Sequence, residues 1–166
     1  VWTEVISTVE RDEQNRITGY HGISRNISER KHTESINNTR LRLLEFATTH
    51  TVVELLKATL DEIELLTGST VGFYHFIEDD QKTLSLQSWS TKTLQHMCKA
   101  LEAGFHYDIS EAGVWADCVR ERKAIIHNNF AALPNKKGMP EGHTEFIREL
   151  VVPVFRCEKI IAVLGI

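Results

Sequence analysis

Residues 1–27 constrain the fold most, because polar and apolar positions alternate there in two short runs. The first run reads VWTEVISTVERD, the second reads ITGYHGISRNI, and the polar segment DEQNR links them. Alternation with a period of two, rich in Val, Ile and Thr, is typical of β-strands, and a short polar link between two such runs predicts a hairpin. A hairpin of two strands is marginal by itself in water. We therefore expect it to belong to something larger or to pack on a neighbour.

A helix is expected directly after the hairpin. Ser28 followed by Glu29 suits a helix start, because the hydroxyl can accept a backbone N–H and the carboxylate lies at the positive end of the helix dipole. The next residues, RKHTESINNTR, are polar on most faces, so this stretch is either solvated or pairs with a partner helix. From residue 41 the pattern predicts one long amphipathic helix ending at Gly68. Its apolar face is formed by Val52, Leu55, Leu56, Leu60, Ile63 and Leu66.

The remainder of the chain alternates between strand and helix patterns. Hairpins are predicted from TVGFYHFIEDD with TLSLQSWST, and from ELVVPVFR with IIAVLGI. Helical spacing occurs in KTLQHMCKALEAG and EAGVWADCVRER, KAIIHNN reads as a short strand, and a long loop follows it. Antiparallel hairpins interleaved with helices predict an α+β fold, a sheet covered by helices.

Charge and cysteine content narrow the surroundings of the chain. The formal net charge is −4 and basic residues are mixed with acidic ones, so no stripe is present that would follow a nucleic acid backbone. No apolar run approaches the roughly 18 residues of a membrane span, so we expect no direct membrane contact. The cysteines, Cys98, Cys118 and Cys157, are an odd number at wide spacings. This pattern favours reduced thiols and a cytoplasmic location.

The stretch GYHGISRNISERKHTE, residues 19–34, resembles the closing strand and exit of a PAS sensor domain. That exit commonly reads G-x-x-G-x-x-R-D-I-T-E-R-K and leads into a signalling helix. Asn26 and Ser28 stand where Asp and Thr are usual, and both keep a short polar side chain. The resemblance implies that residues 1–28 are the last hairpin of a PAS domain and that residues 29–40 form a connecting helix.

Residues 41–166 resemble a GAF domain of the kind that follows PAS domains in bacterial and archaeal sensor histidine kinases. The resemblance rests on LLTGSTVGFYHF, GVWADCVRERKAIIHNN and IRELVVPVFRCEKIIAVLGI, with Ala162 in place of a frequent Gly. GAF domains usually end in a further helix, so we expect this chain to be part of a longer one. No phosphoacceptor histidine box or ATP-binding motif occurs in it, so any kinase activity is expected downstream in the same protein.

The GAF resemblance implies a ligand pocket on one face of the sheet, beneath the helices and loops that follow the second strand. Because strand neighbours point to opposite faces, at most one of Tyr74 and His75 faces it. For any single candidate, core packing or a surface position is the favoured interpretation, and ligand contact is the alternative. The candidate ligand-pocket residues are Tyr74, His75, Trp89, Trp115, Cys118, His127, Asn128, His143 and Arg148.

Cysteines, histidines and one basic loop raise the question of further chemistry at the site. Cys118 could sense oxidation or anchor a tetrapyrrole, but a half-buried thiol on an apolar face is usually inert. The histidines lack compact metal-ligand spacing, so no metal site is predicted, and spacing does not decide about haem. NKKGMPEGH could attract an anion or cover a pocket as a lid, or be a solvated loop. The sequence therefore names no cofactor and no catalytic residue.

The resemblance implies a sensory and relay region of a histidine kinase, and not an enzyme in its own right. It would bind an unknown small molecule or partner and act through a homodimer of connecting helices, shifting populations between two helix arrangements. One alternative is a dimerisation spacer that binds nothing. The other is a thiol-dependent GAF enzyme such as a methionine sulfoxide reductase, which would need a nucleophilic and a resolving cysteine.

Overall fold

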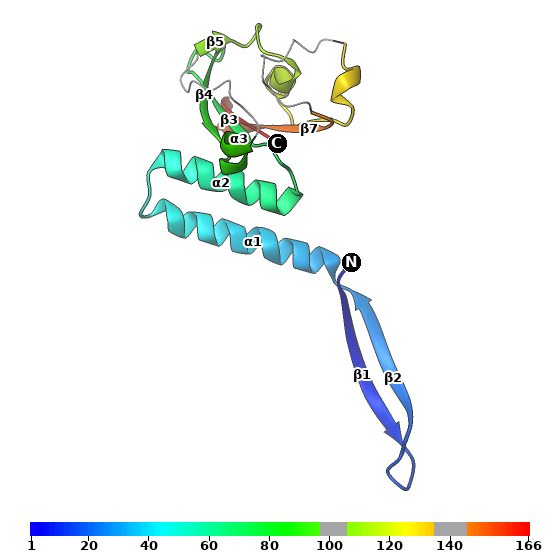
Figure 1. Cartoon of the computed structure of the whole chain (residues 1–166). Helices are drawn as coiled ribbons and strands as arrows, with labels where there is room; N and C mark the ends of the chain where they lie inside the picture. Colours follow the sequence, from blue (N-terminus) through cyan, green and yellow to red (C-terminus); the bar gives the residue numbers. More distant parts are fainter. Residues whose placement is uncertain (97–105, 135–145) are drawn as a thin grey trace. The chain divides into compact units, whose positions relative to one another are not determined.

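A computed structural model of the chain describes residues 1–96, 106–134 and 146–166. The chain forms two compact units, Val1–Leu44 and Glu45–Ile166. The first contains a two-stranded sheet and most of a helix, and the second contains a six-stranded sheet with helices (Figure 1). Within these described ranges, no helix is both long and apolar enough to cross a lipid bilayer.

The predicted N-terminal hairpin is confirmed. β1 (Thr3–Arg11) and β2 (Ile17–Asn26) pair with each other in antiparallel fashion, and neither pairs with the larger sheet. The turn between them is organised by Asp12, whose carboxylate accepts backbone hydrogen bonds from Arg16 (2.8 Å) and Gln14 (2.9 Å). These bonds, the one from Arg16 above all, favour the ionised form and lower the pKa of Asp12.

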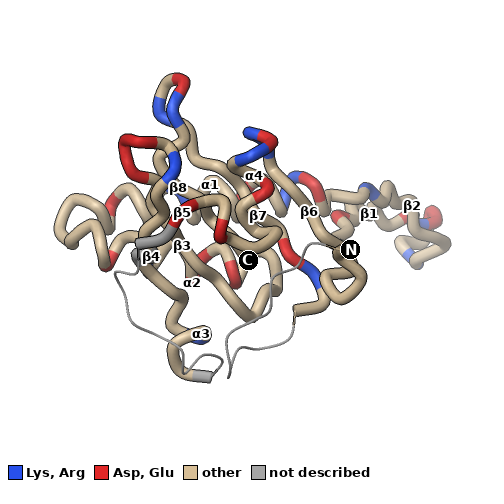
Figure 2. Tube along the Cα trace, turned by 90° about the horizontal axis from the view of Figure 1, so that it is seen from above, with Lys and Arg blue, Asp and Glu red and all other residues tan. Residues whose placement is uncertain are grey.

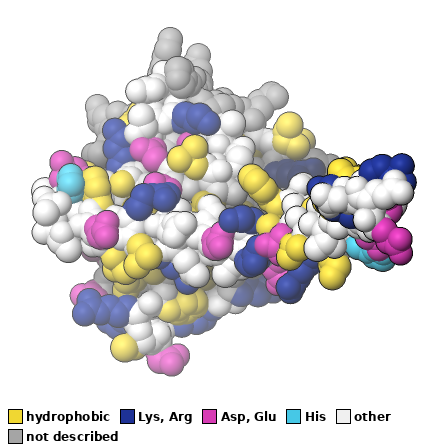
Figure 3. Space-filling view, turned by 90° about the horizontal axis from the view of Figure 1, so that it is seen from below, with side chains coloured by type: hydrophobic (Ala, Val, Ile, Leu, Met, Phe, Trp, Pro, Cys, Tyr) yellow, Lys and Arg dark blue, Asp and Glu magenta, His cyan; other side chains and the backbone are white. Residues whose placement is uncertain are grey.

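Apolar side chains are exposed on both faces of the hairpin. In the strand register Ile6 lies opposite Ile23, and Val9 lies opposite Tyr20 on the other face. Their exposed fractions are 64%, 74%, 45% and 69%. In Figure 3 hydrophobic side chains are visible at the surface among charged ones. The hairpin therefore has two faces able to pack on further structure, as expected for strands that are marginal by themselves.

The helix after the hairpin, α1 (Ser28–Ala47), starts at the predicted residue but in a different way. The Ile27 carbonyl accepts the first helical hydrogen bond (3.0 Å), and the Asn26 side chain accepts the N–H of Ser28 (2.9 Å). The Ser28 hydroxyl accepts the backbone N–H of Trp2, 2.8 Å away. The expectation that this hydroxyl caps its own helix was therefore wrong, because the start of β1 lies beside it and presents a donor.

The expectation of one long helix from residue 41 to Gly68 was also wrong. α1 ends at Ala47, and a second helix, α2 (Val52–Thr67), starts anew. The Thr51 hydroxyl accepts the N–H of Glu54 (3.3 Å), and the Glu54 carboxylate accepts the N–H of Thr51 (2.8 Å). This reciprocal capping box defines a helix start. The predicted end is confirmed, since Gly68 closes α2 in the left-handed conformation with φ of 73°.

The second unit is built on one antiparallel sheet with the strand order β5-β4-β3-β8-β7-β6. The two hairpins predicted here are both present and are joined where β3 pairs with β8. The short predicted strand β6 forms one edge, and β5, which the sequence did not indicate, forms the other. The α+β fold class is confirmed. The strands are β3 (Phe73–Ile77), β4 (Thr83–Trp89), β5 (His106–Asp108), β6 (Ile125–His127), β7 (Glu149–Arg156) and β8 (Lys159–Gly165).

Helices cover both faces of this sheet (Figure 1). α2 packs on one face, and the other face is covered by a 3-10 turn, η1 (Val114–Ala116), that runs into the single turn of α4 (Asp117–Arg120). The helix predicted from EAGVWADCVRER is thus shorter than expected. α3 (Thr91–His96) confirms the start of the helix predicted from KTLQHMCKALEAG, whose later positions lie outside the described residues. A second 3-10 turn, η2, spans Phe130–Ala132.

A buried polar network fastens α2 to the start of α3. The Ser90 hydroxyl donates to the Glu64 carboxylate and lies 2.7 Å from the Thr93 hydroxyl. Thr91 donates to Asp61 from both its N–H and its hydroxyl, at 2.7 Å each. Because buried polar groups that are all paired restrict how elements can pack, this network fixes α2 against the β3–β4 hairpin.

Apolar packing lies mainly on the face covered by α4. Phe73, Leu84, Val151 and Val163 form its buried centre together with Cys118. Charged positions of the second unit lie mainly in turns and helices, with acidic and basic residues interspersed, and β3 and β4 carry none (Figure 2). The α4 face of β3 is therefore an apolar environment into which few polar groups project.

Gly165 is the tightest point of this packing, which gives a first prediction. A Cβ at Gly165 would lie 2.1 Å from the Phe73 ring, so Gly165→Ala must displace the ring or the strand. Overpacking of this kind costs roughly 1–3 kcal/mol. We expect the free energy of unfolding, measured by urea denaturation, to fall by that amount. Gly113→Ala is the control, because its Cβ would meet Trp115 at an ordinary 3.6 Å. Equal stability of the two variants would contradict this account.

Candidate functional site

Four ring side chains pack together on the face of the sheet under α4. Phe73 and His75 come from β3, Trp89 from the end of β4, and Trp115 from η1. The Phe73 ring centroid lies 5.8 Å from that of Trp115 and 6.0 Å from that of Trp89, both edge to face. We call these four residues the aromatic cluster. It brings together three of the predicted pocket residues, and Phe73 was missed because it was counted only as a strand residue.

His75 is the polar member of the aromatic cluster. Its ring stacks on Trp115 with centroids 4.4 Å apart and planes 15° apart. Burial lowers the pKa of His75 to about 3, since removal from water disfavours the charged imidazolium. The imidazole is therefore neutral at physiological pH. Its neighbour Tyr74 points to the opposite face, where it packs edge to face on Phe76 at 5.4 Å, so alternation correctly predicted that only one of the two faces this site.

Cys118 lies beside the aromatic cluster and is fully buried. Its Sγ is 3.5 Å from the carbonyl oxygen of Trp115. Burial, followed by the carboxylates of Glu149 and Asp117, raises the pKa of the Cys118 thiol to about 12. Because the thiolate is the reactive form, a thiol held in this state is a poor nucleophile and a poor redox sensor. The packing interpretation of Cys118 fits this geometry.

Arg120 holds the turn that presents Trp115. Its guanidinium donates to the carbonyl oxygens of Ile109 (2.8 Å) and Ala112 (2.9 Å) and to the carboxylate of Asp117 (2.5 Å). One side chain thus joins the loop before η1 to α4. Sequence reasoning missed this role, because it depends on where the loop turns.

A second group of polar side chains meets at the end of β6. His127 lies directly opposite Glu149 of β7, and its Nδ1 is 2.9 Å from the Glu149 carboxylate. Its Nε2 is 4.0 Å from a carboxylate oxygen of Asp117. Burial raises the pKa of Glu149, although the hydrogen bond with His127 acts in the opposite direction. His127 was a predicted pocket residue, whereas its acidic partners were missed, because the strand register reveals Glu149 and the packing of α4 on the sheet reveals Asp117.

Asn128 and Arg148 belong to a different place. Both line a cavity of about 640 Å³. Ile126 and Leu150, a cross-strand pair of β6 and β7, also line it. None of the four residues of the aromatic cluster lines this cavity, so the two places are separate. The remaining lining residues are Gly68, Ser69, Thr70, Val71, Phe146, Ile147, Glu149 and Ile166. The last candidate, His143, lies outside the described residues.

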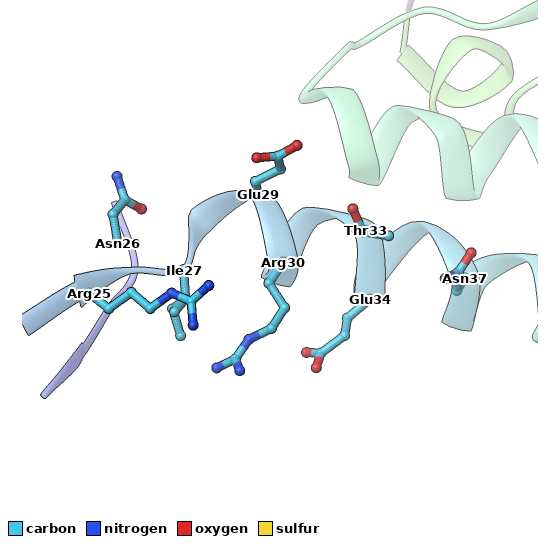
Figure 4. Close-up of a pocket in the computed structure, with 8 residues that line it drawn as sticks. All are labelled: Arg25, Asn26, Ile27, Glu29, Arg30, Thr33, Glu34 and Asn37. Carbon is cyan, nitrogen blue, oxygen red and sulfur yellow. The ribbon is translucent and has the colours of Figure 1, made fainter. Parts of the chain in front are cut away.

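The first unit has a hollow of its own, about 500 Å³ in volume, where β2 runs into α1. Figure 4 shows that its side chains point to different sides of this junction and do not converge on one point. The hollow lacks the apolar walls and convergent polar groups of a ligand pocket. Its lining residues are Arg25, Asn26, Ile27, Glu29, Arg30, Thr33, Glu34 and Asn37.

Among residues 1–96, 106–134 and 146–166, no group of three or more His, Cys, Asp or Glu side chains is arranged to hold a metal ion. The polar groups in and beside the aromatic cluster include the neutral imidazole of His75, the buried indole nitrogen of Trp89 and the protonated thiol of Cys118. The site is thus an apolar surface without fixed charge, suited to stacking and packing and not to acid–base or metal chemistry.

The structure defines an α+β domain with one antiparallel sheet between a long helix and a short helical turn. A sequence model described as the GAF domain matches residues 49–166. The chain belongs to the GAF domain family.

Known proteins resemble this chain in sequence or in fold. The methyl sulfide methyltransferase-associated sensor of Methanosarcina acetivorans is 35% identical over 164 residues, which span 91% of this chain and 16% of that protein. Among solved structures, the GAF domain of a phosphoenolpyruvate-protein phosphotransferase from Coxiella burnetii has a TM-score of 0.65 at 12% identity, covering 81% of this chain and 77% of that one. A free methionine-R-sulfoxide reductase from Neisseria meningitidis, in complex with its substrate, has a TM-score of 0.59 at 15% identity, covering 81% and 73%. At such identities these two structures show the fold alone.

The neutral state of His75 predicts a pH dependence of stability. The pKa is about 3 in the folded chain against 6.5 for the free side chain. Between these values the unfolded chain binds a proton that the folded chain does not, so stability falls as pH drops below 6.5, by at most about 1.4 kcal/mol per pH unit. His75→Phe should remove this loss, which urea denaturation at pH 7 and pH 5 measures. His32→Gln, on the exposed side of α1, is the control. A variant that loses as much stability as the wild type between these pH values would contradict the assignment.

Proposed function

We propose that this chain is a sensory and relay segment of a larger signal-transduction protein, a sensor histidine kinase. The observation that carries the proposal is the 35% identity to a protein named as a sensor. That alignment spans 91% of this chain, so it extends beyond the GAF unit into the residues that precede it. The chain itself is not the catalytic part. A kinase domain would follow it in the same protein.

The sensing site of the proposal is the sheet face under α4. Trp89 and Trp115 are only partly buried there and pack against a buried apolar centre. A planar or apolar ligand could stack on these rings. Because Trp115 is carried by a short 3-10 turn, a ligand could move it more easily than it could move a strand.

The relay element of the proposal is the junction between the hairpin and α1. Backbone atoms of Trp2 bond to Ile27 N–H (3.0 Å) and to the Ser28 hydroxyl (2.8 Å). Arg30 of α1 forms an ion pair with Glu4 of β1 at 2.9 Å. These bonds join the start of β1, the end of β2 and the first turn of α1. A change in the hairpin would therefore be transmitted to the helix.

The hairpin itself is proposed to be the closing part of a PAS domain. Support comes from the PAS-like exit sequence and from the apolar side chains exposed on both faces of the hairpin, which further structure would cover. We further propose a cytoplasmic homodimer in which α1 helices pair, with no contact to nucleic acid or membrane. Leu41 and Leu44 of α1, exposed by 59% and 66%, are the apolar residues available for such pairing.

Two alternatives make different demands. A thiol-dependent reductase needs a reactive cysteine, and the buried Cys118 with its raised pKa does not meet that demand. Replacing all three cysteines separates the two functions. A reductase would lose its activity, whereas a sensor would keep most of its signalling. A spacer that binds nothing would keep the fold and the dimer but show no ligand response.

A thermal-shift screen of the chain tests the sensing site. Haem, nucleotides, small carboxylates and apolar aromatic compounds are the probes, and a ligand at 100 times its dissociation constant adds about 2.7 kcal/mol of stability. We expect Trp115→Ala to lose the shift and Tyr74→Phe, on the opposite face, to keep it. If no compound stabilises the wild type, the spacer is the better description. If Trp115→Ala responds fully, the ligand binds elsewhere.

Distance measurements test the relay junction. Nitroxides carried by unnatural amino acids at Thr8 and Ser35 would report the separation of hairpin and helix by pulsed electron spin resonance. We expect the distance distribution to broaden in Ser28→Ala combined with Arg30→Gln, because two of the junction's bonds are lost. Lys31→Gln is the control, since Lys31 pairs with Glu34 inside α1. An unchanged width in the double variant would show that these bonds do not hold the junction.

A further inference from the structure

Three titratable side chains from three different elements meet at one end of the sheet. His127 ends β6, Glu149 begins β7, and Asp117 begins α4. The imidazole lies between the two carboxylates, 2.9 Å from Glu149 through Nδ1 and 4.0 Å from Asp117 through Nε2. The His127 and Glu149 side chains are only 13% and 6% exposed. Water therefore screens these charges weakly.

The place of this cluster in the fold gives it a mechanical role. β6 is an edge strand of three residues, and β7 is its one strand neighbour in the sheet. The chain leaves the sheet after His127 and returns at Glu149. A backbone hydrogen bond from Phe130 N–H to the Ile147 carbonyl (3.0 Å) lies just beyond them. In the part of the chain that the structure describes, β6 is attached to the sheet through its pairing with β7, so a change in the His127–Glu149 pair acts directly on this attachment.

We propose that His127, Glu149 and Asp117 form a pH-sensitive clasp that holds β6 and α4 to β7. When both ring nitrogens carry a proton, an imidazolium lies between two carboxylates and attracts both. When the imidazole loses its proton, the two carboxylates face each other across a neutral ring. The clasp therefore weakens as pH rises, and the proposal stands independently of which ligand the domain binds.

The other described charged groups around the clasp do not replace the missing cation. Arg120 donates to Asp117 but is otherwise directed to backbone carbonyls of the loop before η1. The Cys118 thiol next to Glu149 is neutral, because its pKa is raised to about 12. Burial raises the pKa of Glu149, which shows that the ionised carboxylate is held at a cost. Ionisation of Glu149 as pH rises therefore destabilises the clasp, and so does loss of the proton from the imidazolium.

Hydrogen exchange of the chain, followed residue by residue by nuclear magnetic resonance, tests the clasp. The measured quantity is the protection factor of the β6 amides divided by that of the β8 amides, which corrects for intrinsic exchange and for global stability. We expect this ratio to fall about tenfold between pH 5.5 and pH 8 in the wild type. In Glu149→Gln, which keeps the shape and removes the charge, it should change less than twofold.

Asp117→Asn provides a second, milder variant that leaves the cross-strand pair in place. It should reduce the pH dependence of the β6 ratio to about threefold, because one of the two repelling carboxylates is gone. A ratio in the wild type that does not change with pH would overturn the proposal. So would a Glu149→Gln variant that keeps the full dependence, since the titrating groups would then lie elsewhere.

Discussion

The pairing of β3 with β8 is the interaction on which the GAF unit depends. It joins two local hairpins that are far apart in sequence, and it places Phe73 directly opposite Gly165. The aromatic ring occupies the space that a side chain at Gly165 would need. Because Phe73 also contacts Trp89 and Trp115, this pairing both closes the sheet and sets the position of the aromatic cluster. Loss of the register would remove the site together with the fold.

Burial decides the chemistry of this domain more than the identity of its residues does. Histidine and cysteine are reactive in many proteins, but here His75 is held neutral and Cys118 is held as a thiol by the same apolar surroundings. The surroundings differ at the end of β6, where His127 keeps a small exposed fraction and lies beside two carboxylates. The aromatic cluster is thus suited to packing and recognition, whereas the edge of the sheet brings an imidazole and two carboxylates together.

The sequence predicted those features that short segments determine by themselves. Alternation identified all three hairpins, and Gly68 marked the end of α2. The break between α1 and α2 was missed although the T-x-x-E signal at Thr51 was present, because apolar spacing on both sides resembled one helix. β5 has three residues, HYD, and lacks the two β-branched residues that marked the equally short β6.

In the candidate site, too, the sequence predicted what one segment determines and missed what depends on contacts between distant segments. Alternation correctly limited the choice between Tyr74 and His75 to one residue, and the cluster contains His75, Trp89 and Trp115 as predicted. Asn128 and Arg148 line a separate cavity, because chain neighbours of a strand need not share its orientation. The link between His127 and Glu149 depends on strand register across 22 residues. No local pattern in a single sequence records such a register.

The break before α2 has a consequence for how rotation could pass along the chain. In an uninterrupted α-helix, one added residue turns everything after it by about 100°. Here the capping box at Thr51 defines the start of α2 independently of the residues before it. An insertion or deletion between Ala47 and Thr51 would therefore not rotate α2 on the sheet that it covers. The break thus uncouples the rotation of α1 about its axis from that of α2.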